Sequence, residues 1–348
     1  MASPEEAPTL TRTAPGPPAR GRRGRPAGGG WLRPVLAGLG AFGMVFGLLL
    51  RLYVAPQLIA APAGFYMVVT LADPHASYFD QRALTIRRDV TLTYSDTIRG
   101  DAGAGTGTIA VWDQFTVLQD LERHNQLIST YQRSAFDRRT GELTNCCGAS
   151  VNDDTRVRQD GIGVVFWPIG TRPATYQVYD TNTERAWPAA YGGTAHVQGL
   201  LTYRFTQRIP ATVVQQIPGV PTALLGLRGP SRTVVANRTF QAISTFWVDP
   251  RTGVPVSVEE RILSVLHAPG GQGRLMVANA DLVMTPASQR ALAALARQNA
   301  AAITTLRQRG PLAGLVLGLV LLLAGTVPLR WPPRVPLRRR VRPGAVAR

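Results

Sequence analysis

Two adjacent cysteines, Cys146 and Cys147, are the only cysteines of this 348-residue chain. If they lie outside the cytoplasm, their thiols tend to oxidise. The two cysteines could form a vicinal disulfide, remain as free thiols, or form a disulfide with another chain. Structural zinc sites use recurrent spacings such as CxxC or HxxxH. Neither spacing occurs in the chain, so we expect no metal site here.

The remaining reactive residue types form no catalytic pattern. The four histidines are scattered along the chain, and Asp153 and Asp154 stand in a polar stretch where two acids are usually solvated. The chain has no GxSxG nucleophile elbow, no HExxH helix and no Ser-x-x-Lys motif. We therefore expect a protein that is not an enzyme and that needs no cofactor.

The segment from Gly161 to Phe205 is unusually rich in aromatic residues. Aromatic side chains dominate the burial in protein cores, so they are typical of a packed interior. They also line small-molecule sites, which are mostly apolar with a few polar groups. The second interpretation makes six residues candidates for ligand binding: Phe166, Trp167, Tyr176, Tyr179, Trp187 and Tyr191.

Apolar residues alternate with polar ones over much of the chain. This pattern predicts strands, and we expect these strands to position the aromatic segment. Leu84, Ile86, Val90, Leu92 and Tyr94 fall on even positions with Arg88 between them, and Leu201, Tyr203, Phe205 and Ile209 fall on odd ones. The same alternation runs through 240–248 and 254–266. Alternation with period two predicts half-buried strands of an antiparallel sheet.

Turn residues separate these strands. Asp137-Arg138-Arg139-Thr140-Gly141 and Asp249-Pro250-Arg251-Thr252-Gly253 share their first and last two residue types. Asp bonds nearby backbone amides and Gly accepts positive φ, so both segments predict β-hairpins. The stretch DAGAGTGT at 101–108 predicts a further turn or loop.

A helix is predicted after the strands, capped by Thr285 with Pro286 at its first position. Its narrow apolar stripe runs over 292–306 and suits a stalk that packs on the domain. A dimerising coiled coil through residues 288–309 is the alternative, so the partner prediction includes a homo-oligomer formed through this helix or through the transmembrane helices.

Two apolar runs enclose the strands, Pro34–Leu50 and Pro311–Leu329. A membrane span needs about 20 mostly apolar residues, and both runs with their flanks reach that length. The first run could instead belong to a signal peptide cleaved near Ala61-Pro62-Ala63, although it is longer than the usual hydrophobic region of such peptides. In that case the second run would still anchor the domain.

The net charge of +17 comes from arginine, and most of the excess lies beside these two runs. Residues 1–33 hold six arginines and two glutamates, and residues 330–348 hold seven arginines and no acid. Basic residues next to a span mark its cytoplasmic side. They also attract anionic lipids. We therefore predict a plasma (inner) membrane protein with both termini in the cytoplasm, membrane lipids as partners and no nucleic-acid partner.

The sequence thus predicts a mainly β (α+β) fold with antiparallel, barrel-like sheets between two transmembrane α-helices. Its segments are a disordered basic tail (1–32), a transmembrane helix (33–56), an extracytoplasmic β-rich domain (57–285), a juxtamembrane helix (286–309), a second transmembrane helix (310–330) and a basic tail (331–348).

Four features carry a resemblance to a known family: the two terminal spans, the segment RLYVAPQL, the block FWPIGTRPATYQVYDTNTERAWPAAYGG and the strand GLLTYRFTQRIP. With these, residues 33–330 resemble the actinobacterial membrane proteins of the porin PorA family, long described as of unknown function. The resemblance implies a conserved outer domain and carries over no catalytic residue. The two-span layout is also similar to that of class B scavenger receptors, which carry hydrophobic ligands through a tunnel.

Three functions follow from this layout. The leading hypothesis is that the outer domain binds or conveys a lipid or other hydrophobic cell-envelope component. The second is a porin or channel component, as the family name suggests. The third is a non-catalytic scaffold for envelope assembly that uses sheet edges or the helix at 288–309.

Overall fold

The computed structural model describes residues 31–230 and 232–327. Apart from Trp31 and Leu32, the two predicted tails lie outside the described residues. The chain divides into two units, one spanning Gly47–Leu312 and one formed by the segments before and after it.

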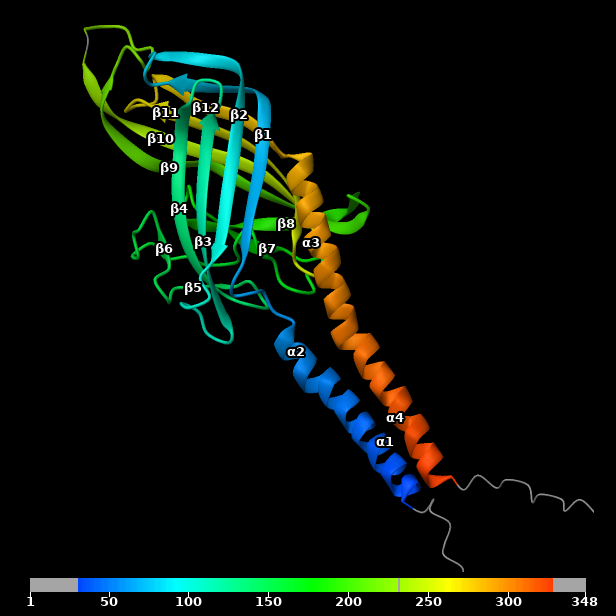
Figure 1. Cartoon of the computed structure of the whole chain (residues 1–348). Coiled ribbons are helices and arrows are strands. Elements are labelled where there is room, and N and C mark those ends of the chain that lie inside the picture. Colours follow the sequence, from blue (N-terminus) through cyan, green and yellow to red (C-terminus); the bar gives the residue numbers. More distant parts are fainter. Residues whose placement is uncertain (1–30, 231, 328–348) are drawn as a thin grey trace, which may run out of the picture. The chain divides into compact units, whose positions relative to one another are not determined.

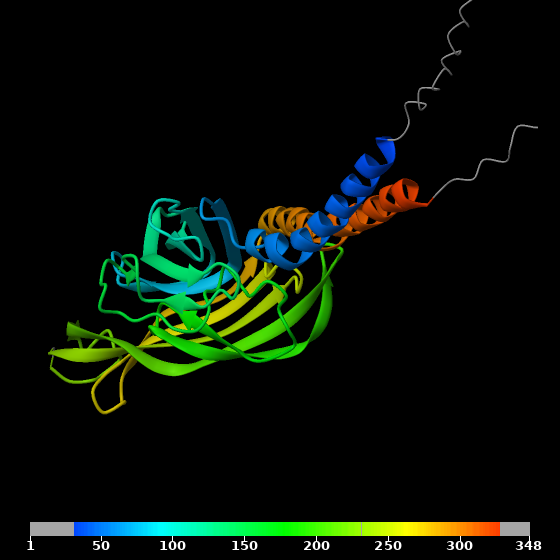
Figure 2. The same cartoon turned by 90° about the horizontal axis from the view of Figure 1, so that it is seen from below.

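The larger unit is built from one antiparallel sheet, which Figures 1 and 2 show as a strongly curled half-barrel. Its strands are β1 (Tyr66–Asp80), β2 (Thr85–Gly100), β3 (Ile109–Asp120), β4 (Asn125–Asp137), β5 (Leu143–Thr144), β6 (Ser150–Val151), β7 (Tyr176–Asp180), β8 (Arg185–Val197), β9 (Leu200–Pro221), β10 (Thr233–Val248), β11 (Pro255–His267) and β12 (Arg274–Met284). The mainly β, barrel-like antiparallel fold predicted from the sequence is confirmed.

The strand order is β5-β4-β3-β2-β1-β12-β11-β10-β9-β8-β7, and β6 pairs with β4. The first long strand therefore pairs with the last one, and Leu71 lies opposite Met284. Because β1 and β12 meet in the middle of the sheet, the chain enters and leaves the half-barrel at one place.

The alternating apolar residues face the inside of the curl, as the sequence predicts. Phe240, Ala242, Phe246 and Val248 on β10 are all buried, as are the alternating residues of β11. The prediction is wrong at Leu84, which lies in a turn at φ 50° with 62 % of its surface exposed. It is also wrong at Leu201 on β9, which is 50 % exposed. Arg88, which interrupts the alternation, falls where the β1–β2 register shifts next to Asp89 at positive φ.

Both predicted hairpins are present. The 137–141 turn joins β4 to β5, and the 249–253 turn joins β10 to β11. In each turn the glycine donates its N–H to the carbonyl of the aspartate, at 2.9 Å. Gly141 and Gly253 have φ of 71° and 73°, a conformation that other residues adopt only with strain.

Three further hairpins share a turn that the sequence analysis missed. In each, an aspartate ends one strand and the residue four positions later has positive φ; the aspartates are Asp80, Asp120 and Asp180. The carboxylate accepts the backbone N–H three residues later, at 3.1, 3.2 and 2.7 Å respectively. Satisfying that amide fixes the turn, since the residue has no partner in the strand ladder.

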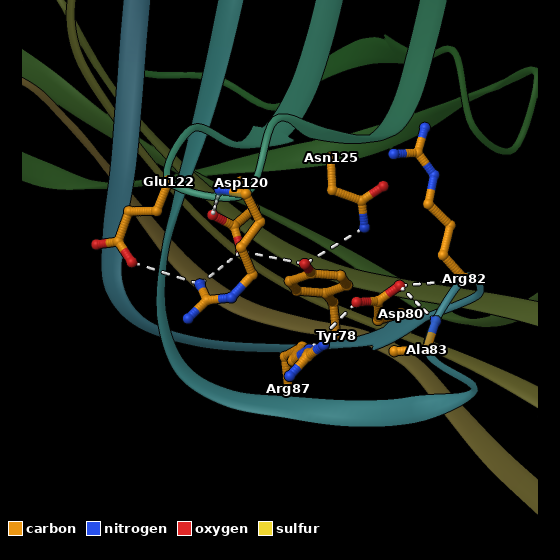
Figure 3. A network of polar contacts seen from close by, with 9 residues as sticks. Tyr78, Asp80, Arg82, Ala83, Arg87, Asp120, Glu122 and Asn125 are labelled. Atoms are coloured by element: carbon orange, nitrogen blue, oxygen red, sulfur yellow. Dashed lines mark hydrogen bonds and ion pairs between the residues drawn. The ribbon is translucent and has the colours of Figure 1, made fainter.

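A network of polar contacts lies at two of these turns (Figure 3). The hydroxyl of the fully buried Tyr78 donates to Asp120 at 3.0 Å and accepts from Asn125 at 3.3 Å. Arg123 donates to the same Asp120 carboxylate at 3.0 Å, while Arg87 pairs with Asp80 at 3.1 Å. The buried carboxylate of Asp120 is therefore held by both a cation and a neutral donor.

A short segment links the two ends of the sheet order. Ile162 forms bridges with Glu142, next to β5, and with Val178 on β7. The N–H of Ile162 donates to Gln177, and its carbonyl accepts from Tyr179 at 2.9 Å. A side chain at Gly161 would collide with the Gln177 carbonyl, so this close approach requires glycine.

The helix α3 (Pro286–Thr304) follows β12 and continues through η2 (Thr305–Arg309) into α4 (Gly310–Thr326). Thr285 caps α3 by accepting the N–H of Ser288 at 3.3 Å. Leu292, Ala293 and Ala296 are buried against the half-barrel. This part of the predicted apolar stripe thus packs on the domain, as a stalk would.

The smaller unit contains parts of two apolar helices, α1 (Leu32–Leu49) and α4. α1 continues through η1 (Leu50–Val54) and α2 (Ala55–Leu58). Within this unit, α1 and α4 pack closely through glycines. A side chain at Gly40, Gly318 or Gly325 would collide with the backbone of the facing helix. Small residues permit such contacts between membrane helices. The two continuous helices, Leu32–Leu58 and Pro286–Thr326, are long and apolar enough to cross a membrane.

Candidate functional site

A cavity of about 210 Å³ lies inside the half-barrel, with α3 contributing Leu292, Leu295 and Asn299 to its lining. The strands line it with every second side chain, such as Trp112, Gln114, Thr116 and Leu118 on β3. Because side chains of a strand alternate between the two faces, each strand presents one set of residues to the cavity.

Most of the lining is aliphatic or aromatic. Its apolar part includes Met67, Val69, Leu71, Ile98, Ile262 and Leu282. Dry cavities with such linings bind small apolar molecules, and an engineered cavity of about 150 Å³ holds benzene. The cavity can therefore hold an apolar group of that size or somewhat larger.

Three acidic residues lie among these apolar ones: Asp96 on β2, Asp180 on β7 and Glu260 on β11. Asp96 accepts from Gln114 at 3.2 Å and from Thr116 at 3.3 Å. Glu260 accepts from Ser244, its cross-strand neighbour, at 3.3 Å. Among the described residues that line the cavity, none is basic.

Burial raises the pKa of all three carboxyls. Loss of hydration raises the pKa of Asp96 to about 6, because the bonds from Gln114 and Thr116 only partly offset it. Burial and the nearby Asp180 raise the pKa of Glu260 to about 7. Burial also raises the pKa of Asp180. Asp96 and Glu260 therefore exchange protons in a range where ordinary carboxyls are fully ionised.

A tyrosine hydroxyl in the lining lacks a partner. Tyr179 is 2 % exposed, and its hydroxyl makes no hydrogen bond within the described part of the chain. A buried polar atom without a partner is costly and rare. The Tyr179 hydroxyl is therefore an unsatisfied polar group of the packed interior.

The structure brings only two of the six predicted aromatic residues to the cavity, Phe166 and Tyr179. Trp167 is fully buried between Phe205, Phe246 and Tyr176, with ring centroids 4.6, 5.5 and 5.4 Å away. This position corresponds to the core interpretation of the block rather than to the ligand interpretation.

The remaining three predicted residues also lie outside the lining. Tyr176 on β7 packs edge-on against Trp167 and Phe205, and the other two, Trp187 and Tyr191, lie on β8. Trp187 donates its indole N–H to Thr183 at 2.9 Å, beside the Asp180 turn. Tyr191 packs edge-on against Tyr203 and Phe205. Their binding role stays a prediction, and their surroundings are those of packed side chains.

Both DxxTG turns hold the segment that carries Phe166 and Trp167. The N–H of Trp167 donates to Gly253 at 3.1 Å, and the N–H of Ile169 donates to Arg139 at 2.9 Å. A side chain at Gly253 would collide with the Trp167 carbonyl. The two turns thereby fix the position of Phe166 in the cavity wall.

Sequence reasoning missed the buried acids, although a signal for them exists. Glu260 is in phase with Val256, Val258 and Ile262 on β11, and Asp96 is in phase with Leu92 and Ile98 on β2. An acid on the apolar face of a strand is either paired inside the core or faces a cavity. This rule would have directed attention to both residues.

The other candidate groups take structural positions. Cys146 and Cys147 are paired with each other in the structure, and their oxidation in the protein stays a prediction. Asp154 pairs with Arg156 at 2.7 Å. The described residues contain no cluster of three or more His, Cys, Asp or Glu that could hold a metal ion.

Comparison with curated proteins gives no match to the chain. The family model described as Porin PorA matches residues 33–327, which include the whole half-barrel and both apolar helices except Leu32. The resemblance seen in the sequence is therefore confirmed, the paired apolar helices are those of a membrane protein, and the chain belongs to the Porin PorA family.

Proposed function

We propose that the half-barrel domain binds a lipid or another hydrophobic component of the cell envelope and holds an apolar segment of it in the internal cavity. The observation that carries the proposal is the cavity of about 210 Å³ inside a curled sheet whose inward side chains are mostly apolar. Small-molecule sites have this composition, an apolar wall with a few polar groups.

The position of the cavity next to α3 supports a link to the membrane. Leu292, Leu295 and Asn299 of α3 line it, and the same continuous helix becomes the apolar α4. The arginine-rich flanks of both spans favour a plasma membrane location with cytoplasmic termini. In that orientation the half-barrel lies outside the cytoplasm, where envelope components are available.

A channel is the second candidate, supported by the family description Porin. A spanning barrel needs a closed ladder of strands with a lipid-facing apolar side. The inward faces of these strands are the apolar ones, and two apolar helices are already long and apolar enough to serve as spans. This pattern favours binding inside the domain over conduction through it.

The test is native mass spectrometry of the full chain purified in detergent, followed by organic extraction and lipid analysis. We expect a co-purifying apolar molecule in a stoichiometric amount. A clean apo mass that stays unchanged after incubation with envelope lipids would overturn the proposal. Ion conductance of the same preparation in planar bilayers, without a bound molecule, would favour the channel.

A pair of variants on β4 locates the bound molecule. Thr130 lines the cavity, whereas its neighbour Ser129 is exposed on the other face. Thr130→Trp fills the space and should abolish co-purification, while Ser129→Trp should leave it unchanged. Equal loss in both variants would place the molecule outside the cavity.

A further inference from the structure

The charge inside the cavity is opposite to the charge of the chain. The sequence has 38 basic and 21 acidic residues, yet the cavity lining holds three acids and, among its described residues, no base. Several buried acids elsewhere have arginine partners: Asp120 contacts Arg123 at 3.0 Å, and Asp249 contacts Arg251 at 3.2 Å. These two turn acids have a cationic partner, whereas no cation lies among the described residues that line the cavity.

The cavity acids also keep unused acceptor capacity. An ionised carboxylate offers about four lone-pair sites. Glu260 uses one of them for Ser244, and Asp96 uses two, for Gln114 and Thr116. The remaining sites have no donor within the described residues, so a ligand that donates hydrogen bonds could fill them.

We propose that the polar group of the bound apolar molecule is a protonated amine, so that the cavity selects cationic amphiphiles over anionic ones. An ammonium group has three N–H donors and no acceptor, which matches a lining that holds carboxylates and, among its described residues, no base. A carboxylate or phosphate headgroup would meet like charges in surroundings of low polarity, where repulsion is strong. The inference rests on the proposed function, because it specifies the headgroup of the apolar ligand.

The cavity size sets the probe. Scaling from benzene in about 150 Å³ gives room for roughly eight non-hydrogen atoms. Hexylamine, hexan-1-ol and hexanoic acid are close to this size and share a six-carbon skeleton, and their polar ends are cationic, neutral and anionic respectively at neutral pH. Their short chains also partition weakly into detergent, which keeps the free concentration known.

Calorimetric titration of these three probes into the full chain in detergent, at pH about 7.5, is the test. We expect hexylamine to bind about tenfold more tightly than hexan-1-ol, and hexanoic acid to bind most weakly. Equal affinity for all three probes, or preference for hexanoic acid, would overturn the proposal of an amine headgroup but not that of an apolar site. If none of the three probes binds, the proposed function is overturned as well.

Variants assign the preference to the cavity acids. Glu260→Gln and Asp96→Asn should each reduce the ratio of hexylamine to hexan-1-ol affinity by several-fold, while hexan-1-ol binding reports an intact fold. Glu259→Gln is the matched control, because Glu259 is the exposed neighbour on the same strand. An unchanged ratio in both cavity variants would overturn the assignment.

Acidification gives a second readout. The titratable groups that face Glu260 and Asp96 in the cavity are Tyr94 and Asp180, with no base among the described lining residues. Lowering the pH from about 8 to about 5 protonates the two acids, because burial raises their pKa values to about 7 and about 6. Hexylamine affinity should fall over this range while hexan-1-ol affinity stays constant; parallel behaviour of the two probes would contradict the proposal.

Discussion

The half-barrel contains desolvated carboxyl groups in two regions, and the pKa of these groups shifts in opposite directions in the two. In the turn network, burial raises the pKa of Asp120, but bonds from Arg123 and Tyr78 outweigh it and the pKa is lowered. In the cavity, the single bond from Ser244 does not offset the burial of Glu260, and the pKa rises to about 7. A paired buried acid stabilises a turn, whereas an unpaired one marks a place where a partner is missing.

The largest effect should come from the paired region. Asp120→Ala leaves the buried Tyr78 hydroxyl and the Arg123 amide without their acceptor, and we expect it to lower the free energy of unfolding by about 3 kcal/mol. Chemical unfolding of the detergent-purified protein, followed by tryptophan fluorescence, measures this loss. Glu122→Ala, with a side chain 65 % exposed, is the control and should cost little.

The pH dependence of that loss has a definite sign. The folded-state pKa of Asp120 lies below the ordinary value of 3.8, so its contribution is present above pH 3.8 and disappears as the pH falls further. Asp120→Ala and the wild type should therefore converge in strongly acidic solution. A difference that stays constant down to the lowest pH would assign the loss to packing instead.

A smaller effect of opposite sign is expected in the cavity. The pKa of Glu260 rises from 4.5 to about 7 on folding, so the native state binds more protons in this window. The free energy of unfolding consequently falls as the pH rises from 4.5 to about 7. Glu260→Gln removes this penalty and should stabilise the protein by about 2 kcal/mol at pH about 8, with little effect near pH 4.

Thermal or chemical unfolding of Glu260→Gln at both pH values checks the prediction. Glu259→Gln again serves as control, since Glu259 is exposed. Destabilisation by Glu260→Gln at pH about 8 would mean that the carboxylate has a partner in the protein, and the contrast between the two regions would be lost.

The smallest effect tests the same contrast with hydroxyl groups. Tyr78→Phe removes a buried donor from Asp120 and should cost about 1 kcal/mol, while Tyr179→Phe removes an unpartnered hydroxyl and should cost nothing. Unfolding of both variants under one condition gives the comparison directly. Equal losses would show that the Tyr179 hydroxyl is satisfied in the protein.

Sequence periodicity predicted the architecture because the half-barrel has one apolar face. Alternation in 240–248 and 254–266 corresponds to buried faces of β10 and β11, and the two DxxTG turns are hairpins. The capped helix after Thr285 and the two apolar helices are also in their predicted positions. Local patterns were sufficient wherever a feature depends on neighbouring residues.

The cavity could not be predicted in this way, because it depends on pairing between distant strands. Aromatic density drew attention to Trp167, Trp187 and Tyr191, which the structure places in packed surroundings, and only Phe166 and Tyr179 line the cavity. The pairing of β1 with β12 and the curl of the sheet decide which residues face inward. Asp96 and Glu260 come together only through that curl.

The bridge made by Gly161 and Ile162 has a consequence for the behaviour of the protein in a crowded membrane. An uncovered sheet edge is a template on which strands of other molecules add, leading to aggregation. Here Ile162 occupies backbone groups of Gln177 and Tyr179 at one edge, and Gly161 accepts the N–H of Leu143 at the other. One two-residue segment of the chain itself thus blocks intermolecular strand addition at both places, and neighbouring copies can lie side by side without joining their sheets there.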